Sequence, residues 1–447
     1  MALTGLQIYK LLPRTNCKEC GFPTCLAFAM KLAAKQAELS LCPYVSEESK
    51  AQLSAAAAPP IRLITLNADG KRIEVGNETV LFRHEKTFYH PAAVMVRIPD
   101  DMPPDAAAAL AKRAADYRVD YVGISLHVDG FAIDGVSGES DKFASIVDAV
   151  VGASKMPLIL VSEDPAVIAA GLAKTQGIVP LICGATSENW QAMAKLAKDH
   201  AAPLAVRGST LDELAELTQK LVDQGIEDLV LDPTQRTFSS SLVTLTQIRR
   251  LALKKDFRPL GYPVIAFPYL GEADPEMEAL LAAQQIAKYA GFVVLSHFDP
   301  ATVYPLLVLR QNIFTDPQKP IQVEPGIYPI NKPSESSPVL VTTNFSITYF
   351  AVANELESSG HPGWLMVSDA EGMSVLTAWA AGKFDAEKIA KTVKGFGIAE
   401  KINHKRVIIP GHVAILMGEL EEELPGWEIK VGPREAVDLP RYLKTVA

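Results

Sequence analysis

The sequence predicts an α/β protein with a small cysteine-containing N-terminal domain, a central (β/α)8 barrel and a C-terminal Rossmann-like doubly wound domain. Three observations predict this architecture. Four of the five cysteines lie within the first 42 residues, eight apolar runs alternate with helical segments between residues 92 and 316, and a shorter alternation follows residue 331. We place the domain boundaries at residues 1–58, 59–91 for a linker and hairpin, 92–325, and 326–447.

The composition is that of a folded globular protein and argues against two classes of partner. Hydrophobic residues make up 48% of the 447 residues and charged residues 21%, which favours a buried core over long disorder. The net charge of -9 argues against nucleic-acid binding, which needs a basic face. The first residues do not resemble a secretory signal, and no apolar run reaches the roughly 18 residues of a membrane helix. We therefore expect a cytoplasmic protein that contacts neither nucleic acid nor a membrane.

The N-terminal cysteines form the pattern C-x2-C-x4-C-x16-C, followed directly by Pro43. Thiols clustered in a reducing compartment indicate a metal site more than disulfides. We predict a helix from about residue 24 to 39 that begins after Pro23, with its positive dipole end near the third cysteine. The predicted ligands are Cys17, Cys20, Cys25 and Cys42.

Four thiolates alone do not distinguish an iron-sulfur cluster from a zinc ion. Zinc ribbons usually pair two C-x2-C knuckles, whereas this chain has only one, so we predict a [4Fe-4S] cluster. Cys183 stands alone in an apolar run, and we assign it no role. After this domain, residues 51–60 (AQLSAAAAPP) read as a linker, and residues 61–67 and 73–83 as a β-hairpin around the turn sequence ADGKR.

The central block has the repeat count and size of a TIM barrel, whose strands are covered on both faces and therefore nearly all apolar. An open doubly wound sheet is the alternative. The predicted strands are residues 93–98, 121–128, 157–162, 179–185, 203–208, 228–233, 263–268 and 292–298.

Polar residues at the predicted strand ends are the candidates for chemistry in the barrel. They are His127, Asp129, Ser162, Asp164, Asn189, Arg207, Asp232, His297 and Asp299. Several precede a proline or lie near a serine, as ordinary turn and helix-start residues do. The chain contains no phosphate loop, no His-Glu-x-x-His and no nucleophile elbow, so we assign no catalytic residue.

The C-terminal block begins after a second predicted linker, residues 331–338 (NKPSESSP). Strands are predicted at residues 339–343, 364–369, 405–410 and 427–431, in a parallel sheet with helices at 346–359, 370–383, from 385, and 412–423. The loops after these strands should form a ligand crevice, in which glycines allow a close backbone approach. These loops are residues 342–346, 368–374, 409–414 and 431–436.

Many corrinoid-binding domains present a histidine to cobalt within Asp-x-His-x-x-Gly, and this chain contains no such sequence. His361 and His412 flank a proline or glycine at element edges, and we expect both at the surface. Binding without a protein histidine makes reduction to the nucleophilic Co(I) easier, because an axial nitrogen donates electron density that favours Co(II).

Several segments together resemble one family, the large (gamma) subunit of the corrinoid iron-sulfur protein of the reductive acetyl-CoA pathway. They are LLPRTNCKECGFPTCLAFAMKLA with the later CPY, TTNFSITYFAVANELE, DAEGMSVLTAWAAGKF and IIPGHVAILMGELEEELPGW. The resemblance covers essentially the whole chain. It implies that the four cysteines hold the cluster and that a base-off corrinoid without a protein histidine ligand lies against the C-terminal loops. The residues carried over are Thr342, Thr343, Asn344, Ser346, Gly372, Met373, Ser374, Gly411, His412, Gly432, Pro433, Arg434 and Ala436.

The resemblance also implies a function and partners. Co(I) accepts a methyl group from methyltetrahydrofolate on a separate methyltransferase, and methyl-Co(III) delivers it to acetyl-CoA synthase, while the cluster reverses occasional oxidation to Co(II). A smaller barrel subunit is the implied permanent partner, with the barrel here as scaffold. We expect the two linkers to let the outer domains swing about the barrel. The alternatives are a pterin-dependent methyltransferase barrel and an electron-transfer scaffold without corrinoid.

Overall fold

The computed structural model describes residues 5–33, 37, 39–46, 49, 53, 59–121, 124–272, 274–316 and 321–446. The chain divides into two compact units, Met1–Tyr117 with His127–Phe314, and Arg118–Leu126 with Thr315–Ala447. Most of the linker predicted at residues 51–60 lies outside the described residues. Within the described ranges, no helix combines the length and apolar character that a bilayer crossing requires.

The N-terminal cysteines lie in and between short helical segments, and only Cys25 is inside a helix. Helices α1 (Gly5–Leu11) and α2 (Cys25–Ala33) pack on each other, and the 3-10 turn η1 (Leu39–Leu41) precedes Cys42. Phe28 and Ala29 of α2 are fully buried in their shared core. The prediction that Cys25 lies in the first turn is confirmed, although α2 ends at Ala33; residues 34–36 and 38 are outside the described part.

The predicted hairpin is present as β1 (Ile64–Ala68) and β2 (Lys71–Val75), which pair antiparallel. Its turn residues Asp69 and Gly70 have φ of 43° and 82°, the left-handed pair that a type I′ turn requires. The second strand ends at Val75 and is therefore shorter than predicted, because the next two residues also have positive φ and turn the backbone away. A third, two-residue strand, β8 (Ile178–Val179), pairs with β1.

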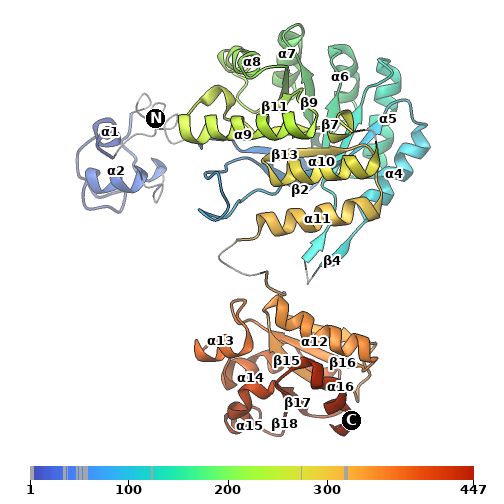
Figure 1. The fold of residues 1–447 in the computed structure, drawn as a ribbon. Coiled ribbons are helices and arrows are strands. Elements are labelled where there is room, and N and C mark those ends of the chain that lie inside the picture. The colour runs from blue at the N-terminus through green and yellow to red at the C-terminus, as the bar shows by residue number, and fades with distance from the viewer. Residues whose placement is uncertain are drawn as a thin grey trace. The chain divides into compact units, whose positions relative to one another are not determined.

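Eight parallel strands close into a barrel, which confirms the predicted (β/α)8 architecture. Nearly all strand residues are buried, because the helices of Figure 1 cover the outside of the sheet. The strands are β3 (Ala93–Pro99), β6 (Gly130–Asp134), β7 (Leu158–Val161), β9 (Leu181–Ala185), β10 (Leu204–Gly208), β11 (Leu229–Pro233), β12 (Val264–Ala266) and β13 (Ala290–Leu295). The helices are α4 (Pro104–Asp116), α5 (Ser140–Ala153), α6 (Pro165–Leu172), α7 (Trp190–Asp199), α8 (Leu211–Asp223), α9 (Phe238–Lys255), α10 (Pro275–Ala287) and α11 (Pro300–Phe314).

The prediction for the second barrel strand is wrong. Residues 121–128 do not enter the barrel; instead β4 (Val119–Tyr121) and β5 (Ile124–Leu126) form an antiparallel hairpin that belongs to the second compact unit. The barrel strand is β6, which begins with Gly130. A Cβ on Gly130 would lie 2.2 Å from the carbonyl oxygen of Pro157, so glycine is needed where the two backbones approach.

The C-terminal unit contains a five-stranded sheet in the order β14-β16-β15-β17-β18. The strands are β14 (Gly326–Ile330), β15 (Val339–Thr343), β16 (Gly363–Ser368), β17 (Arg406–Ile409) and β18 (Glu428–Val431). The prediction of a wholly parallel sheet is wrong at one edge, where β14 pairs antiparallel with β16. Residues 331–338, predicted as an interdomain linker, join β14 to β15 inside this sheet. Pro329 suits an edge strand because it cannot donate to a second neighbour.

Helices cover both faces of this sheet (Figure 1). One face packs against α12 (Ser346–Ser359) and α16 (Leu439–Val446), and the other against α13 (Val375–Ala380), α14 (Ala386–Gly395) and α15 (Met417–Glu423). The predicted α-helices at 370–383 and 412–423 are shorter in the structure. The first is reduced to α13, and the second is reduced to α15, which is preceded by the 3-10 segment η5 (Gly411–Leu416). The chain order reverses between β15 and β17, where open sheets of this kind bind ligands.

Candidate functional site

The four N-terminal cysteines lie around one small core. Cys25 and Cys42 are buried in it, Cys20 is half-buried against it, and Cys17 is exposed. Among the described residues, no group of three or more His, Cys, Asp or Glu side chains is close enough to hold a metal ion. A cluster of four irons holds its thiolates farther apart than a single ion does. The types of donor present and the backbone around them therefore decide whether a cluster fits this site.

A tyrosine connects the two ends of the cysteine pattern. The hydroxyl of Tyr44 donates to Oε1 of Glu19 at 2.8 Å, which ties the residue after Cys42-Pro43 to the loop that carries Cys17. The hydrogen bond to Glu19, the charge of Glu19 and, more weakly, the charges of Cys17 and Cys42 raise the pKa of Tyr44. The contact therefore joins the loop between the first two cysteines to the segment that follows the last one.

The loop before α2 has an unusual backbone. Arg14, Asn16 and Lys18 have φ of 59°, 51° and 67°, while the residues between them do not have positive φ, and Gly21 has φ of 81°. Alternation of this kind points successive N–H groups to one side and forms concave sites for anions, among them iron-sulfur clusters. Together with four thiolates and the N-terminus of α2, this loop fits an anionic cluster.

The second candidate site is a pocket at the carboxyl ends of the C-terminal strands, next to the switch between β15 and β17. It has a cavity volume of about 330 Å³ and is lined by the ends of β15 and β17 together with the starts of α12, α13 and the loops after β17 and β18. The pocket brings together seven of the thirteen residues predicted for the cofactor. These are Thr342, Ser374, His412, Gly432, Pro433, Arg434 and Ala436.

Two hydroxyls at the end of β15 have no hydrogen-bond partner among the described residues. Thr342 and Thr343 are 1% and 0% exposed, and neither Oγ1 makes a hydrogen bond within the described structure. Leaving a buried hydroxyl unpaired costs about 1–3 kcal/mol. Thr342 lines the pocket, so a bound ligand can supply the missing partner there, whereas Thr343 does not line it.

The six other predicted residues lie in the same loops but do not line this pocket: Thr343, Asn344, Ser346, Gly372, Met373 and Gly411. Asn344 holds a loop, because its Oδ1 accepts from the N–H groups of Ala370 and Gly372, each at 2.9 Å. A Cβ on Gly411 would lie 2.6 Å from the carbonyl oxygen of Gly432, so this glycine lets two loops touch.

The two histidines considered as cobalt ligands lie at opposite ends of the sheet. His412 lines the pocket, and its Nε2 lies 3.8 Å from Oε1 of Glu435. His361 lies before β16, at the amino end of the sheet, where its Nδ1 contacts Oγ of Ser359 at 3.0 Å. Of these two histidines, only His412 lines the pocket.

Sequence reasoning missed an apolar rim around the pocket. Ile347 and Leu376 line the pocket and are 68% and 47% exposed. Ile415 and Val437, which follow the other two parallel strands, are 73% and 68% exposed and lie close in sequence to the lining residues His412 and Ala436. Exposed large apolar residues gathered at one place usually mark a binding surface. The sequence signal that could have revealed this rim is an apolar residue in or near the first turn of the segment after a strand, because polar residues are usual at that position.

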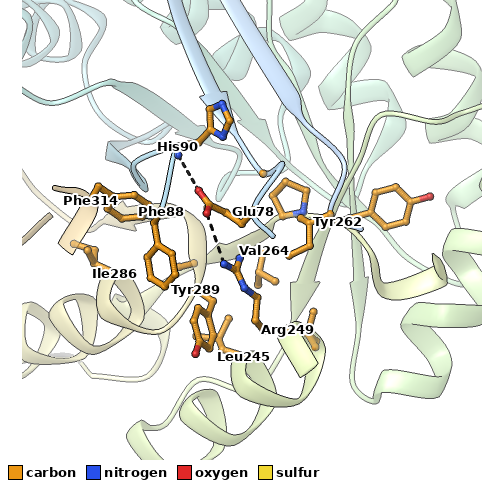
Figure 2. Close-up of a pocket in the computed structure, with 16 residues that line it drawn as sticks. Glu78, Phe88, His90, Leu245, Arg249, Tyr262, Val264, Ile286, Tyr289 and Phe314 are labelled. Atoms are coloured by element: carbon orange, nitrogen blue, oxygen red, sulfur yellow. Dashed lines mark hydrogen bonds and ion pairs between the residues drawn. The ribbon is translucent and has the colours of Figure 1, made fainter. Parts of the chain in front are cut away.

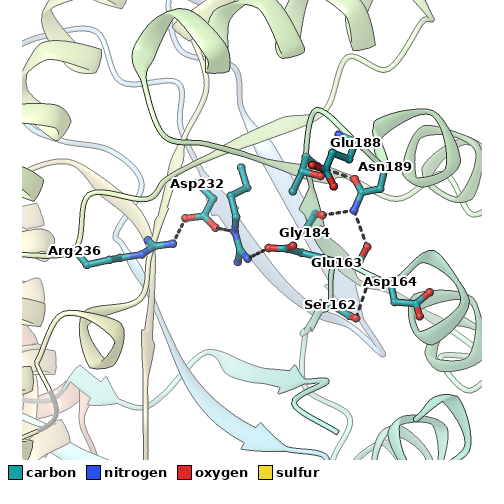
Figure 3. A network of polar contacts seen from close by, with 10 residues as sticks. Ser162, Glu163, Asp164, Gly184, Glu188, Asn189, Asp232 and Arg236 are labelled. Atoms are coloured by element: carbon teal, nitrogen blue, oxygen red, sulfur yellow. Dashed lines mark hydrogen bonds and ion pairs between the residues drawn. The ribbon is translucent and has the colours of Figure 1, made fainter. Parts of the chain in front are cut away.

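The barrel mouth, at the carboxyl ends of the barrel strands, is filled by ion pairs (Figure 3). Asp232 is fully buried and accepts from Nε of Arg207 at 2.8 Å and from Nη2 of Arg236 at 2.6 Å. Arg207 also pairs with Oε1 of Glu163 at 2.5 Å. Beside them, Arg97 pairs with Asp134 at 2.6 Å. The charges of these six side chains are therefore paired with one another.

Most other strand-end candidates have the structural roles that their turn-like sequences predict. Asp164 caps α6 by accepting from the N–H of Ala166 at 2.8 Å, and the amide of Asn189 bonds three backbone groups of nearby loops. Asp299 accepts from the N–H of Thr302 at the start of α11. Ser162 accepts from the N–H of Asp164, and His297 contacts Ser296.

His127 and Asp129 are not where they were predicted. Because β6 begins at Gly130, both precede the strand and lie at its amino end, opposite the mouth. Asp129 accepts from the N–H of Val94 at 2.7 Å and pairs with Arg310.

A further pocket lies at the amino ends of β12 and β13 (Figure 2). Glu78 and Arg249 are 6% and 5% exposed there, and Oε2 of Glu78 lies 3.8 Å from Nη2 of Arg249. Burial raises the pKa of Glu78 and lowers that of Arg249 to about 10, although each charge counteracts the shift of the other. In barrels of this kind the amino end stabilises the fold, and the chemistry lies at the other end.

Comparisons with known proteins agree along the whole chain. The family described as CO dehydrogenase/acetyl-CoA synthase delta subunit matches residues 63–443, and the one described as putative Fe-S cluster matches residues 12–44. The chain is 47% identical over 444 residues to the corrinoid/iron-sulfur protein large subunit of Moorella thermoacetica, which covers 99% of each chain. It is 36% identical over 454 residues to the acetyl-CoA decarbonylase/synthase complex subunit gamma of Methanopyrus kandleri, covering 99% of this chain and 97% of that one.

Among solved structures, the chain is similar to a dihydropteroate synthase from Xanthomonas albilineans in complex with 7,8-dihydropteroate. The two share 17% identity at a TM-score of 0.40, over 57% of this chain and 100% of that one.

Proposed function

Because the chain belongs to the family of corrinoid/iron-sulfur protein large subunits and acetyl-CoA decarbonylase/synthase gamma subunits, we propose that it is a corrinoid methyl carrier with an N-terminal [4Fe-4S] cluster. When bound, the corrinoid supplies a cobalt centre that takes a methyl group from methyltetrahydrofolate through a methyltransferase and passes it to acetyl-CoA synthase, and the cluster supplies the electron that restores oxidised cobalt. The rest of the proposal concerns what the residues of this chain do.

The observation that carries the proposal is the pocket beside β15 and β17. A corrin has broad apolar faces and a periphery of amides, so it needs an apolar platform edged by hydrogen-bonding groups. The rim side chains Ile347 and Leu376 line the pocket and offer apolar contact. The unpartnered hydroxyl of Thr342 and the backbone beside Gly432 offer polar contact.

Cobalt receives no protein histidine in this proposal. The chain lacks Asp-x-His-x-x-Gly, and Nε2 of His412 lies 3.8 Å from Glu435, so His412 belongs to the polar wall of the pocket. Without a protein nitrogen beneath it, a base-off corrinoid is easier to reduce. The loops then need only to bind the corrin and leave its other face accessible to methyl donors and acceptors.

Four thiolates hold the cluster in this proposal: Cys17, Cys20, Cys25 and Cys42. The family match over residues 12–44 and the anion-binding backbone before α2 favour iron-sulfur over zinc. The partners we propose are a smaller barrel subunit, a methyltetrahydrofolate methyltransferase and acetyl-CoA synthase, in the cytoplasm. The exposed rim around the pocket gives such partners an apolar surface to contact.

The barrel of this chain acts as a scaffold in this proposal. Its mouth presents charges that are paired with one another, as for Asp232 with Arg207 and Arg236, which gives a pterin few free groups to bind. That observation is why we do not favour the alternative of a pterin-dependent methyltransferase barrel.

Metal analysis of anaerobically purified protein tests the proposed function. We expect about one cobalt and about four iron atoms per chain, with the visible absorption of both a corrinoid and an iron-sulfur cluster. Protein reconstituted under nitrogen that keeps zinc in place of iron and takes up no cobalamin would contradict the proposal. Iron without any corrinoid would favour an electron-transfer scaffold.

A further inference from the structure

Asn16 and Cys25 are joined by two hydrogen bonds that run in opposite directions. Oδ1 of Asn16 accepts from the backbone N–H of Cys25 at 2.8 Å, and the backbone N–H of Asn16 donates to Sγ of Cys25 at 3.4 Å. Cys25 is the first residue of α2, so its N–H has no acceptor inside the helix. Asn16 therefore bonds both the first backbone N–H of α2 and the sulfur of Cys25, a proposed cluster ligand.

The backbone of Asn16 makes this double contact possible. Its φ of 51° lies in the left-handed region, which asparagine, aspartate and glycine adopt more readily than other residues. With this conformation the side chain reaches the N–H of Cys25 while the main chain donates to the sulfur of the same residue. A glycine at this position would keep the backbone shape but lose the side-chain acceptor that ties the loop to the start of α2, so the N–H of residue 16 would no longer be held at the sulfur of Cys25.

Helix α2 also has a conventional cap, and this cap does not involve the cysteine sulfur. Oγ1 of Thr24 accepts from the N–H of Ala27 at 3.0 Å, as an N-cap threonine does. The contact from Asn16, nine residues before Cys25, is thus an addition to ordinary capping. Thr24 provides a matched control, because it bonds the same turn of the same helix.

We propose that Asn16 is a positioning residue for the cluster, which orients the Cys25 thiolate and raises the reduction potential of the cluster. The inference rests on the proposed function, since it requires a cluster on Cys25. Hydrogen bonds to cluster sulfurs are among the features that set cluster potentials. An N–H donated to sulfur stabilises the more negative, reduced cluster, so its loss makes reduction harder.

The test uses the full chain as wild type, Asn16→Gly and Thr24→Ala, each reconstituted anaerobically with iron and sulfide. The readouts are the iron content and the midpoint potential, measured by a redox titration followed by electron paramagnetic resonance. We expect a more negative midpoint for Asn16→Gly and the wild-type midpoint for Thr24→Ala. Equal midpoints for the two variants would overturn the inference.

A second variant covers the case in which Asn16→Gly cannot hold the cluster. Asn16→Asp keeps the acceptor and tolerates the left-handed backbone, so we expect it to retain iron as the wild type does. Loss of iron from Asn16→Asp as severe as from Asn16→Gly would show that the acceptor is not what matters. A wild-type chain that takes up no iron would instead refute the cluster itself, before any variant is compared.

Discussion

The barrel mouth and the C-terminal pocket are both built at the carboxyl ends of parallel strands, yet they use their polar groups in opposite ways. At the mouth, the buried carboxylate of Asp232 accepts from two arginines, and one of these also binds Glu163. At the pocket, the hydroxyl of Thr342 is buried without a partner, and large apolar side chains are exposed around it.

This difference shows why position at a strand end does not by itself predict a ligand site. A polar group that already has a partner inside the protein gains little by bonding a ligand, because binding must first break that contact. A buried group without a partner carries a cost that a ligand can remove. This criterion favours our proposal that the C-terminal pocket, and not the barrel mouth, binds the cofactor.

The largest expected effect comes from breaking the network at the mouth. Asp232→Asn removes the counter-charge of two guanidiniums whose side chains are only 22% and 14% exposed. We expect a loss of about 3–5 kcal/mol from the free energy of unfolding of the barrel, measured by urea denaturation. Cobalamin affinity should not change.

The control for this variant is an exposed ion pair. Glu139→Gln breaks the contact between Glu139 and Lys142, whose side chains are 60% and 55% exposed, and should cost no more than about 1 kcal/mol. Similar losses for both variants, or loss of cobalamin binding from Asp232→Asn, would contradict the contrast between the two regions.

The next effect comes from separating two loops of the pocket. Gly411→Ala places a methyl group 2.6 Å from the carbonyl oxygen of Gly432, so the loops after β17 and β18 must move apart. We expect a loss of about 1–3 kcal/mol in stability and weaker cobalamin binding, measured by denaturation and spectral titration. Gly418→Ala is the control, because a Cβ there meets no atom within 4 Å and its site lies in helix α15. Weaker binding in Gly418→Ala as well would remove the support for the loop contact.

A smaller effect distinguishes two neighbouring threonines. Thr342→Val should weaken cobalamin binding by about 0.5–1.5 kcal/mol, the net contribution of one hydrogen bond, and should leave the apoprotein as stable as before or slightly more so. Thr343→Val removes an equally buried, unpartnered hydroxyl that does not line the pocket, so affinity should stay unchanged. Equal affinity of the two variants, measured by equilibrium titration, would contradict the assignment of Thr342.

The smallest effect concerns a thiol inside the closed barrel. Burial raises the pKa of Cys183 on β9 to about 12 from an ordinary 9.0, so the folded protein keeps the proton while the unfolded chain ionises. This contribution to stability is present below pH 9.0 and is lost as the pH rises toward about 12. We expect iodoacetamide at pH 8 to leave Cys183 of the apoprotein unmodified until urea unfolds the barrel, as mass spectrometry of peptides would show. Rapid labelling without urea would mean that the barrel is open.

Much of the fold follows from residue pattern, because buried parallel strands are apolar throughout and eight of them match a barrel. The second strand could not be found in this way. Residues 121–128 are as apolar and β-branched as a barrel strand, whereas β6 starts with Gly130, where a Cβ would meet the backbone of Pro157 and the side chain of Met95. Tertiary packing, which a local pattern does not contain, decides between the two segments.

The C-terminal site shows a similar limit. The sequence places polar loops at the carboxyl ends of the strands, and seven of the residues carried over from the family line one pocket. The sequence does not show that the side chain of Asn344 accepts from two backbone N–H groups while the hydroxyl of Thr342 has no partner among the described residues. Hydrogen-bond partners depend on loops that are distant in the chain. The edge strand β14 was missed for a related reason, since Pro329 reads as a turn until its antiparallel neighbour is known.

Hydrogen-deuterium exchange with and without cobalamin tests whether the C-terminal pocket binds the corrinoid. We expect cobalamin to slow exchange in residues 342–346, 368–374, 409–414 and 431–436, and to leave the barrel mouth around Arg207 and Asp232 unchanged. Protection at the barrel mouth with no change in the C-terminal loops would contradict this expectation.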